Sequence, residues 1–516
     1  MKSTTWRKLR QLSQWLFFLL FLYLLIQVVN LNPTSPLIGF FYRLDPLLAT
    51  TAMLAGRVWI GGFILAGITI LLTLLLGRVW CGWICPLGSL LEWISPSASH
   101  QRQTKREPST RWRKLKFLLL VVILLAALWK NQTLVLFDPL TLLTRTIAAS
   151  IWPAWQYGMH NVESFLYQFR FLWPVLDWMR AIVNLQTFMA ARGVFDGALT
   201  IALIFLSLIA LNWVARRFWC RYLCPLGGLL AWLSRFALLR REVTDSCNQC
   251  GLCARICPTG TIDPEQGYRS DSAECTMCLD CLTDCKQGSV KFRWQFPAWK
   301  VAPGQGYDIT RRELLAGAAI AAGGILLAGV EPVTHRTPAQ LIRPPGALLT
   351  DFEELCIRCG ECVRVCPTQG LQPSLLEGGW QNIYTPRLVP RLGYCAYDCS
   401  ACTQVCPSGA IPKMTMDVKR VTPIGLASID RDRCLPWAYD TPCLVCEEMC
   451  PLPEKAIRLT TGGEQGQGRR NDLPRPYILR DLCIGCGVCE YHCPAGSQSA
   501  IQVFSIPISN APMMGL

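Results

Sequence analysis

The sequence predicts an α-helical membrane domain of four spans with an internal two-fold repeat, then a small cysteine-rich domain, a fifth span and a larger cysteine-rich domain of the α+β class. Three observations predict this class. Hydrophobic residues make up 51% of the 516 residues and charged residues only 16%, which is low for a soluble protein. Most of the 28 cysteines fall into groups of four. A weakly apolar run over residues 314–330 separates two sets of these groups.

Four apolar runs in the first 240 residues predict the membrane domain (residues 1–240). They cover residues 15–29, 58–76, 117–129 and 198–215, and runs of this kind are typical of membrane-spanning helices. Arg and Lys gather in residues 78–116 and 216–241, so the positive-inside rule predicts that both segments and the N-terminus are cytoplasmic. The net charge of +15 is thus explained by topology and does not indicate nucleic-acid binding.

The membrane domain repeats two motifs. The motif Leu44-Asp45-Pro46-Leu47 returns as Phe137-Asp138-Pro139-Leu140, and Trp80-Cys81-Gly82-Trp83-Ile84-Cys85-Pro86 returns as Trp219-Cys220-Arg221-Tyr222-Leu223-Cys224-Pro225. Each unit is interpreted as a span, an Asp-Pro turn on the outer side, a second span and a Cys-x3-Cys-Pro motif on the inner side. Two spans per unit preserve orientation, so the halves are expected to be related by an axis along the membrane normal.

Residues 241–300 have the cysteine spacing of a two-cluster bacterial-type ferredoxin. In this pattern three thiolates of one motif and the fourth cysteine of the other hold each [4Fe–4S] cluster. Zinc is the competing interpretation, but zinc modules seldom use this doubled spacing. The predicted ligands of the first cluster are Cys247, Cys250, Cys253 and Cys285, and those of the second are Cys275, Cys278, Cys281 and Cys257.

Residues 340–516 repeat the pattern four times and predict a four-cluster polyferredoxin domain. The second motif is widened by one residue and the third by a longer insertion, so the two altered motifs are expected to share a module. This predicts a nested pairing, in which the first motif shares clusters with the fourth and the second with the third. An alternative for the third motif is that it has lost its cluster. The predicted ligands are Cys356, Cys359, Cys362, Cys366; Cys395, Cys399, Cys402, Cys406; Cys434, Cys443, Cys446, Cys450; and Cys483, Cys486, Cys489, Cys493.

Six groups of four cysteines predict six [4Fe–4S] clusters, or about 24 iron atoms. The positions of the histidines indicate that the membrane domain binds no haem through paired histidines. The four histidines are His100, His160, His335 and His492, and none lies in an apolar run. No nucleotide-binding fingerprint of the GxGxxG kind is present. The predicted role is a relay of electrons, and the sequence indicates no catalytic residue.

Four cysteines lie outside the ferredoxin pattern: Cys81, Cys85, Cys220 and Cys224. Cys-x3-Cys is one turn of an α-helix, so each pair is expected on one side of its helix, and the repeat is expected to bring the pairs together. One hypothesis is an additional iron site of four thiolates in the membrane domain. The alternatives are free thiols packed as small apolar groups and redox-active thiols; a structural disulfide is disfavoured on a reducing cytoplasmic side.

The fifth apolar run follows Thr310-Arg311-Arg312-Glu313. Residues 308–332 are interpreted as a twin-arginine-like leader or transmembrane segment, with a buried core helix as the alternative. If the run crosses the membrane, the two-cluster domain is cytoplasmic and the four-cluster domain extracytoplasmic.

With these motifs, the chain resembles a fusion of two known subunits. Residues 1 to about 295 resemble the membrane quinol dehydrogenase subunit that serves periplasmic nitrate reductase, and residues 310–516 resemble its four-cluster ferredoxin partner, as in the methylamine-utilisation ferredoxin family. The resemblance implies a multi-pass protein of a bacterial or archaeal cytoplasmic membrane. It would oxidise quinol and pass electrons to an extracytoplasmic reductase or cytochrome. The alternative function is an accessory or regulatory protein for a respiratory enzyme.

Overall fold

The structure is a computed structural model of the chain. It describes residues 3–27, 37–95, 110–174, 176–178, 195, 197–295, 341–349, 351–460, 473–496 and 498–505, with several single positions between 312 and 323. The chain divides into two compact units, one made of Met1–Thr144 and Ala202–Val330 and the other of Arg145–Ile201 and Glu331–Leu516.

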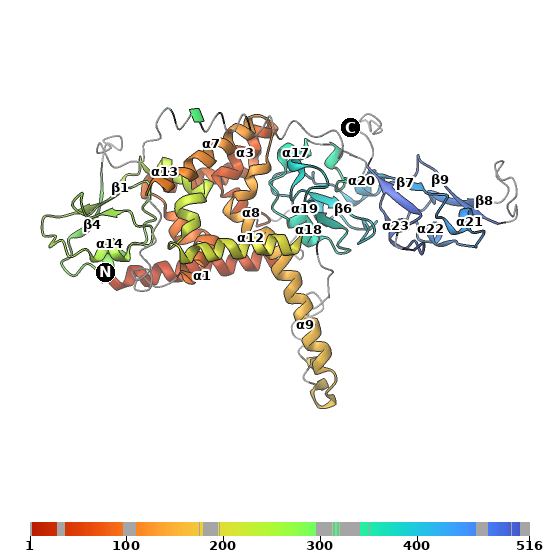
Figure 1. The fold of residues 1–516 in the computed structure, drawn as a ribbon, viewed down its shortest axis with the longest axis horizontal. Helices are drawn as coiled ribbons and strands as arrows, with labels where there is room; N and C mark the ends of the chain where they lie inside the picture. Colours follow the sequence, from red (N-terminus) through yellow and green to blue (C-terminus); the bar gives the residue numbers. More distant parts are fainter. Residues whose placement is uncertain are drawn as a thin grey trace. The chain divides into compact units, whose positions relative to one another are not determined.

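The first unit contains a helical domain (Figure 1). Its helix α7 packs against α3 and α13, and the buried residues of α7 include Phe117, Leu120 and Ile123, one turn apart on one face. The helices are α1 (Ser3–Gln27), α2 (Phe40–Arg43), α3 (Pro46–Gly56), α4 (Ala66–Leu76), α5 (Pro86–Ile94), α7 (Leu115–Leu128), α8 (Pro139–Thr146), α12 (Ala198–Ala210) and α13 (Pro225–Ser234), with short turns η1 (Gly61–Leu65), η2 (Trp80–Ile84), η3 (Thr110–Lys114), η4 (Thr133–Phe137), η7 (Leu211–Trp213) and η8 (Trp219–Leu223).

The four apolar runs predicted as spans lie largely in helices: α1, α4 with η1, α7, and α12 with η7. Among the described residues, one helix, Thr5–Gln27, is both long and apolar enough to cross a membrane, whereas Gly61–Leu76 and Ala198–Trp213 are apolar but shorter. By length and composition, the described residues therefore contain one candidate membrane helix.

The two Asp-Pro motifs begin short buried helices, α3 and α8, and are not turns at the far end of the domain. Asp138 interacts electrostatically with Cys85, and the ring of Phe137 lies 6.3 Å from that of Trp219, next to Cys220. The prediction that the Asp-Pro motifs lie on the opposite side from the Cys-x3-Cys-Pro motifs is therefore wrong. Proline at the first helical position favours a helix start, and the helices so formed begin inside the domain.

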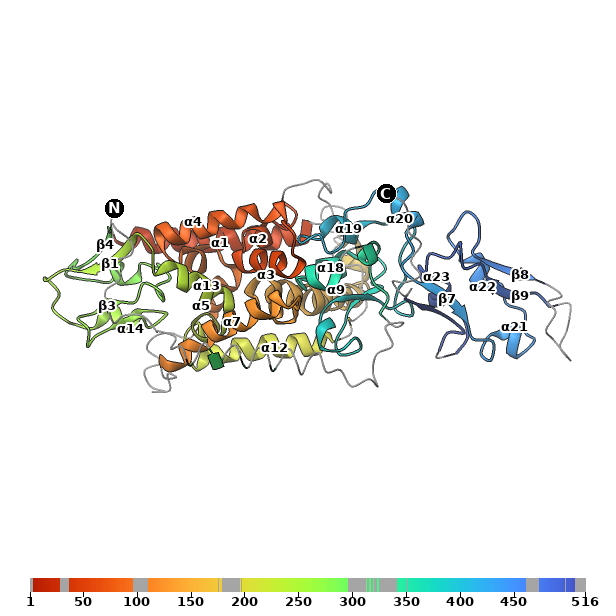
Figure 2. The same ribbon diagram turned by 90° about the horizontal axis from the view of Figure 1, so that it is seen from above.

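The small cysteine-rich domain of the first unit packs beside the start of α1 (Figure 2). Its main sheet pairs β1 (Leu239–Val243) with β4 (Val290–Trp294) antiparallel, and β2 (Ile262–Asp263) pairs with β3 (Arg269–Ser270). Two short helices, α14 (Leu252–Ile256) and α15 (Asp280–Thr283), follow cysteine loops. Its core contains Ile262, Cys281 and Val290.

The second unit contains the larger cysteine-rich domain, built from three two-stranded antiparallel sheets and short helices among the described residues. The sheets are β5 (Leu371–Pro373) with β6 (Pro386–Leu388), β7 (Leu426–Ile429) with β10 (Ile501–Phe504), and β8 (Ile457–Thr460) with β9 (Arg475–Ile478). The helices are α17 (Phe352–Leu355), α18 (Glu361–Val365), α19 (Ala401–Val405), α20 (Met416–Val421), α21 (Leu435–Ala438), α22 (Val445–Glu448) and α23 (Val488–Tyr491), with turns η10 (Ala347–Leu349) and η11 (Trp380–Asn382).

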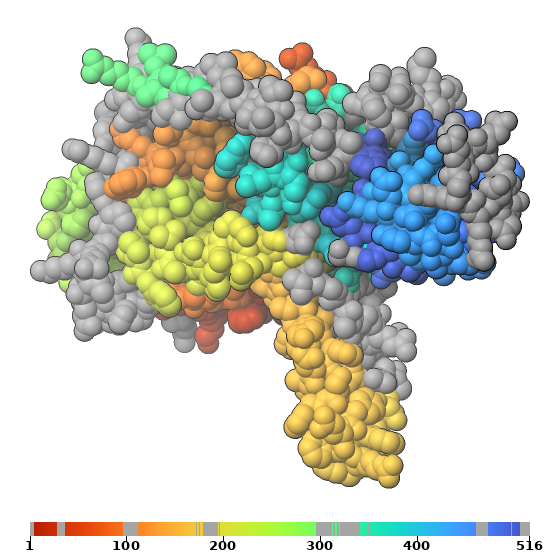
Figure 3. Space-filling view, turned by 45° about the vertical axis from the view of Figure 1, so that its right-hand side comes forward, coloured from red at the N-terminus to blue at the C-terminus, as the bar shows by residue number. Residues whose placement is uncertain are grey.

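The same unit includes the segment that follows α8. It contains the π-helical turn η5 (Ile147–Ile151), the helix α9 (Trp152–Leu166) and the turn η6 (Arg170–Leu172). The turn η5 packs against α18, and Arg145 stacks 4.2 Å from the ring centre of Tyr384. Figure 3 shows α9 as a projecting rod, and its exposed residues include Trp155, Tyr157 and Phe165. The predicted leader, residues 308–332, lies almost entirely outside the described residues.

Candidate redox site

The Cys-x3-Cys-Pro motifs have the same unusual backbone in both repeats. Each begins with a π-helical turn, Trp80–Ile84 or Trp219–Leu223. Cys85 and Cys224 then leave the helix in an extended conformation, with φ −61° and ψ 116° at Cys85. A residue before proline avoids the helical region for steric reasons. The prediction of one α-helical turn is therefore wrong, because Pro86 and Pro225 end the turn and start a new helix.

The second cysteine of each motif caps that new helix. The thiol of Cys85 accepts a hydrogen bond from the backbone N–H of Gly88 at 3.4 Å, and that of Cys224 accepts one from Gly227 at 3.2 Å. Helix N-termini carry partial positive charge and favour a negative group. The caps thus place two helix N-termini at these sulfur atoms.

All four cysteines of these motifs meet in one buried cluster, which we call the membrane-motif quartet. They are free thiols with 5–8% of their surface exposed. Cys85 interacts electrostatically with Cys81 and Cys220, and Cys224 with all three others. The predicted meeting of the two pairs therefore agrees with the structure.

Two buried aspartates lie in the same part of the first unit. Asp45 and Asp138 have no exposed surface, and one oxygen of each caps its helix, at 2.8 Å from the backbone nitrogen of Leu47 and 2.9 Å from that of Leu140. The two carboxyl groups interact electrostatically with each other, and the second oxygen of each, Oδ2, has no hydrogen-bond partner among the described residues. Burial next to a like charge favours the protonated form of a carboxyl group.

We predict that Asp45→Ala lowers stability by about 1 kcal/mol through loss of the α3 cap, whereas Asp45→Asn loses less because the amide oxygen still accepts these bonds. The midpoint of thermal unfolding in detergent, measured by circular dichroism, compares the two variants. Equal losses would show that the cap does not stabilise α3.

The quartet lies directly against a cysteine loop of the small domain. A Cβ atom on Gly82 would lie 2.2 Å from the carbonyl oxygen of Thr276, between Cys275 and Cys278. Next to it, the indole N–H of Trp83 donates to the carbonyl of Met277 at 2.9 Å. The first membrane motif and the loop of the second predicted cluster are therefore in backbone contact, which only glycine permits.

Buried charges hold this junction together. Lys116 Nζ lies 2.6 Å from Glu274 Oε2, and Arg78 donates to the same carboxylate at 3.2 Å. All three side chains are at most 1% exposed. Burial disfavours the charge on Glu274, but Lys116 and Arg78 outweigh it and hold its pKa below the usual value.

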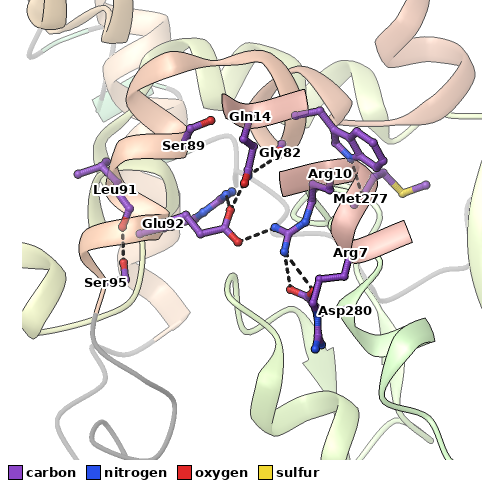
Figure 4. Close-up of polar contacts among 12 residues, drawn as sticks. Arg7, Arg10, Gln14, Gly82, Ser89, Leu91, Glu92, Ser95, Met277 and Asp280 are labelled. Atoms are coloured by element: carbon purple, nitrogen blue, oxygen red, sulfur yellow. Dashed lines mark hydrogen bonds and ion pairs between the residues drawn. The ribbon is translucent and has the colours of Figure 1, made fainter. Parts of the chain in front are cut away.

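A second network joins α1, α5 and the small domain (Figure 4). Arg10 lies 2.5 Å from Glu92 and 3.1 Å from Asp280, and Glu92 also pairs with Arg217. Burial disfavours the charge on Glu92, yet Arg217 and Arg10 lower its pKa to about 2. Gln14 completes the network by donating to Gly82 O at 2.8 Å and to Glu92 at 2.7 Å.

The ferredoxin-spaced cysteines of the first unit gather as two sets. Cys257 interacts with Cys275, Cys278 and Cys281, the set predicted for the second cluster. Cys253 interacts with Cys247 and Cys250, and both Cys253 and Cys285 pack against the core that contains Ile262.

In the second unit the cysteine motifs pair in sequence order, so the predicted nested pairing is wrong. Three cavities and the contacts of the first motif show this. Each cavity is lined by the cysteines of one cluster position: Cys366, Cys395, Cys399 and Cys402; Cys434, Cys443, Cys446 and Cys493; and Cys450, Cys483, Cys486 and Cys489. The remaining set is Cys356, Cys359 and Cys362, which interact with Cys406.

Known proteins match this cysteine framework. Models described as "4Fe-4S dicluster domain" match residues 355–411 and 441–497, and models described as "4Fe-4S binding domain" match residues 58–104 with 198–243, and 242–263. The methylamine utilization ferredoxin-type protein MauM of Methylorubrum extorquens is 36% identical over 203 residues, which cover 38% of this chain and 88% of the relative. The chain belongs to the MauM and NapG family of ferredoxin-type proteins.

Two further relatives differ in how much of the chain they cover. The ferredoxin-type protein NapG of Escherichia coli is 32% identical over 210 residues, which are 39% of this chain and 89% of NapG. An uncharacterized protein of Methanocaldococcus jannaschii is 27% identical over 293 residues, 56% of this chain and 96% of its own length. No solved structure matches the chain.

Family membership and the [4Fe-4S] domains make this chain an iron–sulfur electron-transfer protein. One dicluster model covers the first two motifs, and the other covers the fourth motif and the third from Cys443 onward, in agreement with pairing in sequence order. The cysteines present fit [4Fe–4S] clusters, since four thiols gather at each position. They would hold clusters that accept and release single electrons.

Sequence reasoning missed the ionic residues of the junction, above all Glu92, Lys116 and Glu274. Lys116 and Glu92 each lie at the edge of an apolar segment. A charged residue in this position can indicate a buried ion pair as well as the end of a membrane span. The partner Glu274 carries no such signal, because its ion pairs span more than 150 positions.

We predict that Cys366→Ser alters the cluster of Cys395, Cys399 and Cys402, and not that of the first motif, because Cys366 completes the second set. Electron paramagnetic resonance of the anaerobically prepared, dithionite-reduced protein would show one altered [4Fe–4S] signal. The matched variant Cys406→Ser is expected to alter a different signal. Identical spectra for the two variants would contradict the pairing.

Proposed function

We propose that this protein oxidises quinol in a membrane and passes the electrons through six [4Fe–4S] clusters to an extracytoplasmic reductase or another redox partner. The single observation that carries the proposal is the backbone contact between Gly82, in the first membrane motif, and Thr276, in a cluster loop. It puts a buried, cysteine-lined part of the helical domain next to a predicted cluster, as an electron relay requires.

The surface of the helical domain supports a membrane location. In α4 the buried residues are Ala66, Thr69 and Thr73, on one face, while Ile68 and Leu71 are 48% and 56% exposed. An outward face that is apolar, opposite a buried face that carries threonines, suits a lipid environment. With the resemblance of the chain to a quinol dehydrogenase subunit, this favours quinol as the electron donor.

Asp45 and Asp138 give the helical domain two buried carboxyl groups that could accept protons. Oxidation of one quinol to quinone releases two electrons and two protons. In the proposed reaction quinol transfers its electrons one at a time to the clusters. Its protons are accepted by buried carboxyl groups or by water. The free Oδ2 atoms of the pair would be the buried oxygens that take up such a proton.

The test is reduction of the clusters by a menaquinol analogue in purified, anaerobic membranes, followed by electron paramagnetic resonance. Quinol is expected to reduce clusters that dithionite also reduces. An oxidant added on the outer side is expected to reoxidise them. Clusters that dithionite reduces and quinol leaves oxidised would contradict the proposal and favour an accessory role.

The proposed topology has its own test. Reporter fusions at about residue 300 and at the C-terminus are expected to report opposite sides of the membrane, because the Arg and Lys bias predicts a cytoplasmic two-cluster domain. Signals from the same side would contradict the extracytoplasmic position of the four-cluster domain.

A further inference from the structure

We propose that the membrane-motif quartet, Cys81, Cys85, Cys220 and Cys224, binds a seventh iron–sulfur cluster. The inference deepens the proposed function by assigning a metal centre to the helical domain, but its test does not depend on quinol. Four cysteine thiolates are the usual ligand set of both [2Fe–2S] and [4Fe–4S] clusters.

The backbone at the quartet is that of cluster cysteines elsewhere in this chain. Cys85 and Cys224 have φ/ψ of −61°/116° and −67°/113°. The Cys-Pro cysteines of the ferredoxin motifs have nearly the same values, −61°/115° at Cys257, −67°/113° at Cys366 and −68°/112° at Cys406. The spacing Cys-x3-Cys-Pro is also shared, so each membrane motif repeats the second half of a ferredoxin motif.

Backbone N–H groups point at these sulfur atoms, as they do at a ferredoxin cysteine. Gly88 and Gly227 donate to Cys85 and Cys224, and Ile411 donates to Cys406 at 3.4 Å. Hydrogen bonds to the sulfurs of a cluster stabilise its negative charge. Packed neutral thiols gain little from such donors.

Buried positive charges beside the quartet favour an anion there. Arg78 and Lys116 are fully buried and pair with Glu274, and Asp271 also interacts with Lys116. Arg78 Nη2 lies 4.0 Å from Cys81 Sγ. A cluster held by four thiolates is anionic, and a buried positive charge at this distance would stabilise it.

The position of the quartet suits a relay centre. Arg217 interacts electrostatically with both Cys220 of the quartet and Cys278 of the cluster loop. A centre at the quartet would therefore be the neighbour of the cluster predicted at Cys275, Cys278, Cys281 and Cys257. Redox-active thiols alone would exchange two electrons, whereas ferredoxin clusters exchange one.

The experiment compares iron and acid-labile sulfide in the full chain and in a Cys81→Ser, Cys220→Ser double variant, both prepared without air. The double variant is expected to lose about two to four iron atoms with an equal number of sulfides, while the dithionite-reduced ferredoxin signals persist and report folding. Ser89→Ala is the matched control, since Ser89 is buried on α5 and donates to the Cys85 carbonyl; it is expected to keep all iron.

Equal iron and sulfide in the double variant and the wild type would overturn the proposal, as would loss of iron without sulfide. If the double variant does not fold, the wild-type count decides: about 26 to 28 iron atoms per chain support a seventh cluster, and about 24 contradict it. Failure of quinol to reduce a protein with the larger count would contradict the proposed function alone.

Discussion

Glu274→Gln is expected to destabilise the first unit by about 3–5 kcal/mol, because removal of one partner leaves buried charges without compensation. The carboxylate is 1% exposed and pairs with Lys116 and Arg78, which are equally buried. Glutamine keeps the shape of the side chain and removes only its charge. The expected result is a large drop in the yield of folded protein and in the midpoint of thermal unfolding in detergent.

The matched control is Glu242→Gln in the same small domain. Glu242 is 40% exposed and its partner Arg293 57% exposed, at 3.4 Å, so the loss there is expected to stay below about 1 kcal/mol. If both variants unfolded at the same temperature, the buried pairs of Glu274 would contribute no more than a surface pair. The junction between the helical and small domains would then have to be stabilised by packing alone.

The sequence predicted those features that depend on local pattern. Apolar runs predicted helical segments, and the spacing Cys-x2-Cys-x2-Cys-x3-Cys predicted the ferredoxin motifs, because both follow from residues close together in the chain. The internal repeat predicted that Cys81 and Cys220 would meet, since equivalent segments pack at equivalent positions. In the structure these two thiols interact.

The errors came from features that depend on tertiary structure. Nested pairing was predicted from the widened spacing of the motifs at Cys395 and Cys434, but the first two motifs are joined by the short hairpin β5–β6, which favours pairing of neighbours. The Asp-Pro motifs were predicted as turns on the outer side of the membrane, because Asp-Pro commonly starts a turn. The same dipeptide also starts a helix with Asp as its cap and Pro as its first residue, and only burial distinguishes the two.

Gly82→Ala is expected to slow the transfer of electrons from quinol to the clusters more than any other single methyl group added to the helical domain. The new Cβ would lie 2.2 Å from the carbonyl oxygen of Thr276, and a backbone atom cannot turn away as a flexible side chain can. The loop that carries Cys275 and Cys278 must therefore move off the membrane motif. Overpacking of this kind costs about 1–3 kcal/mol.

The measurement is stopped-flow reduction of the clusters by a menaquinol analogue, with dithionite as a reductant that does not need the junction. Gly67→Ala is the matched control, because Gly67 lies in α4 and its added Cβ would meet no atom within 4 Å beyond its chain neighbours and the backbone of its own helix. We expect slow quinol reduction and complete dithionite reduction in Gly82→Ala, and wild-type rates in Gly67→Ala. Equal quinol rates in both variants would mean that electrons do not cross at Gly82 and Thr276, and the relay would then need another contact to reach the small domain.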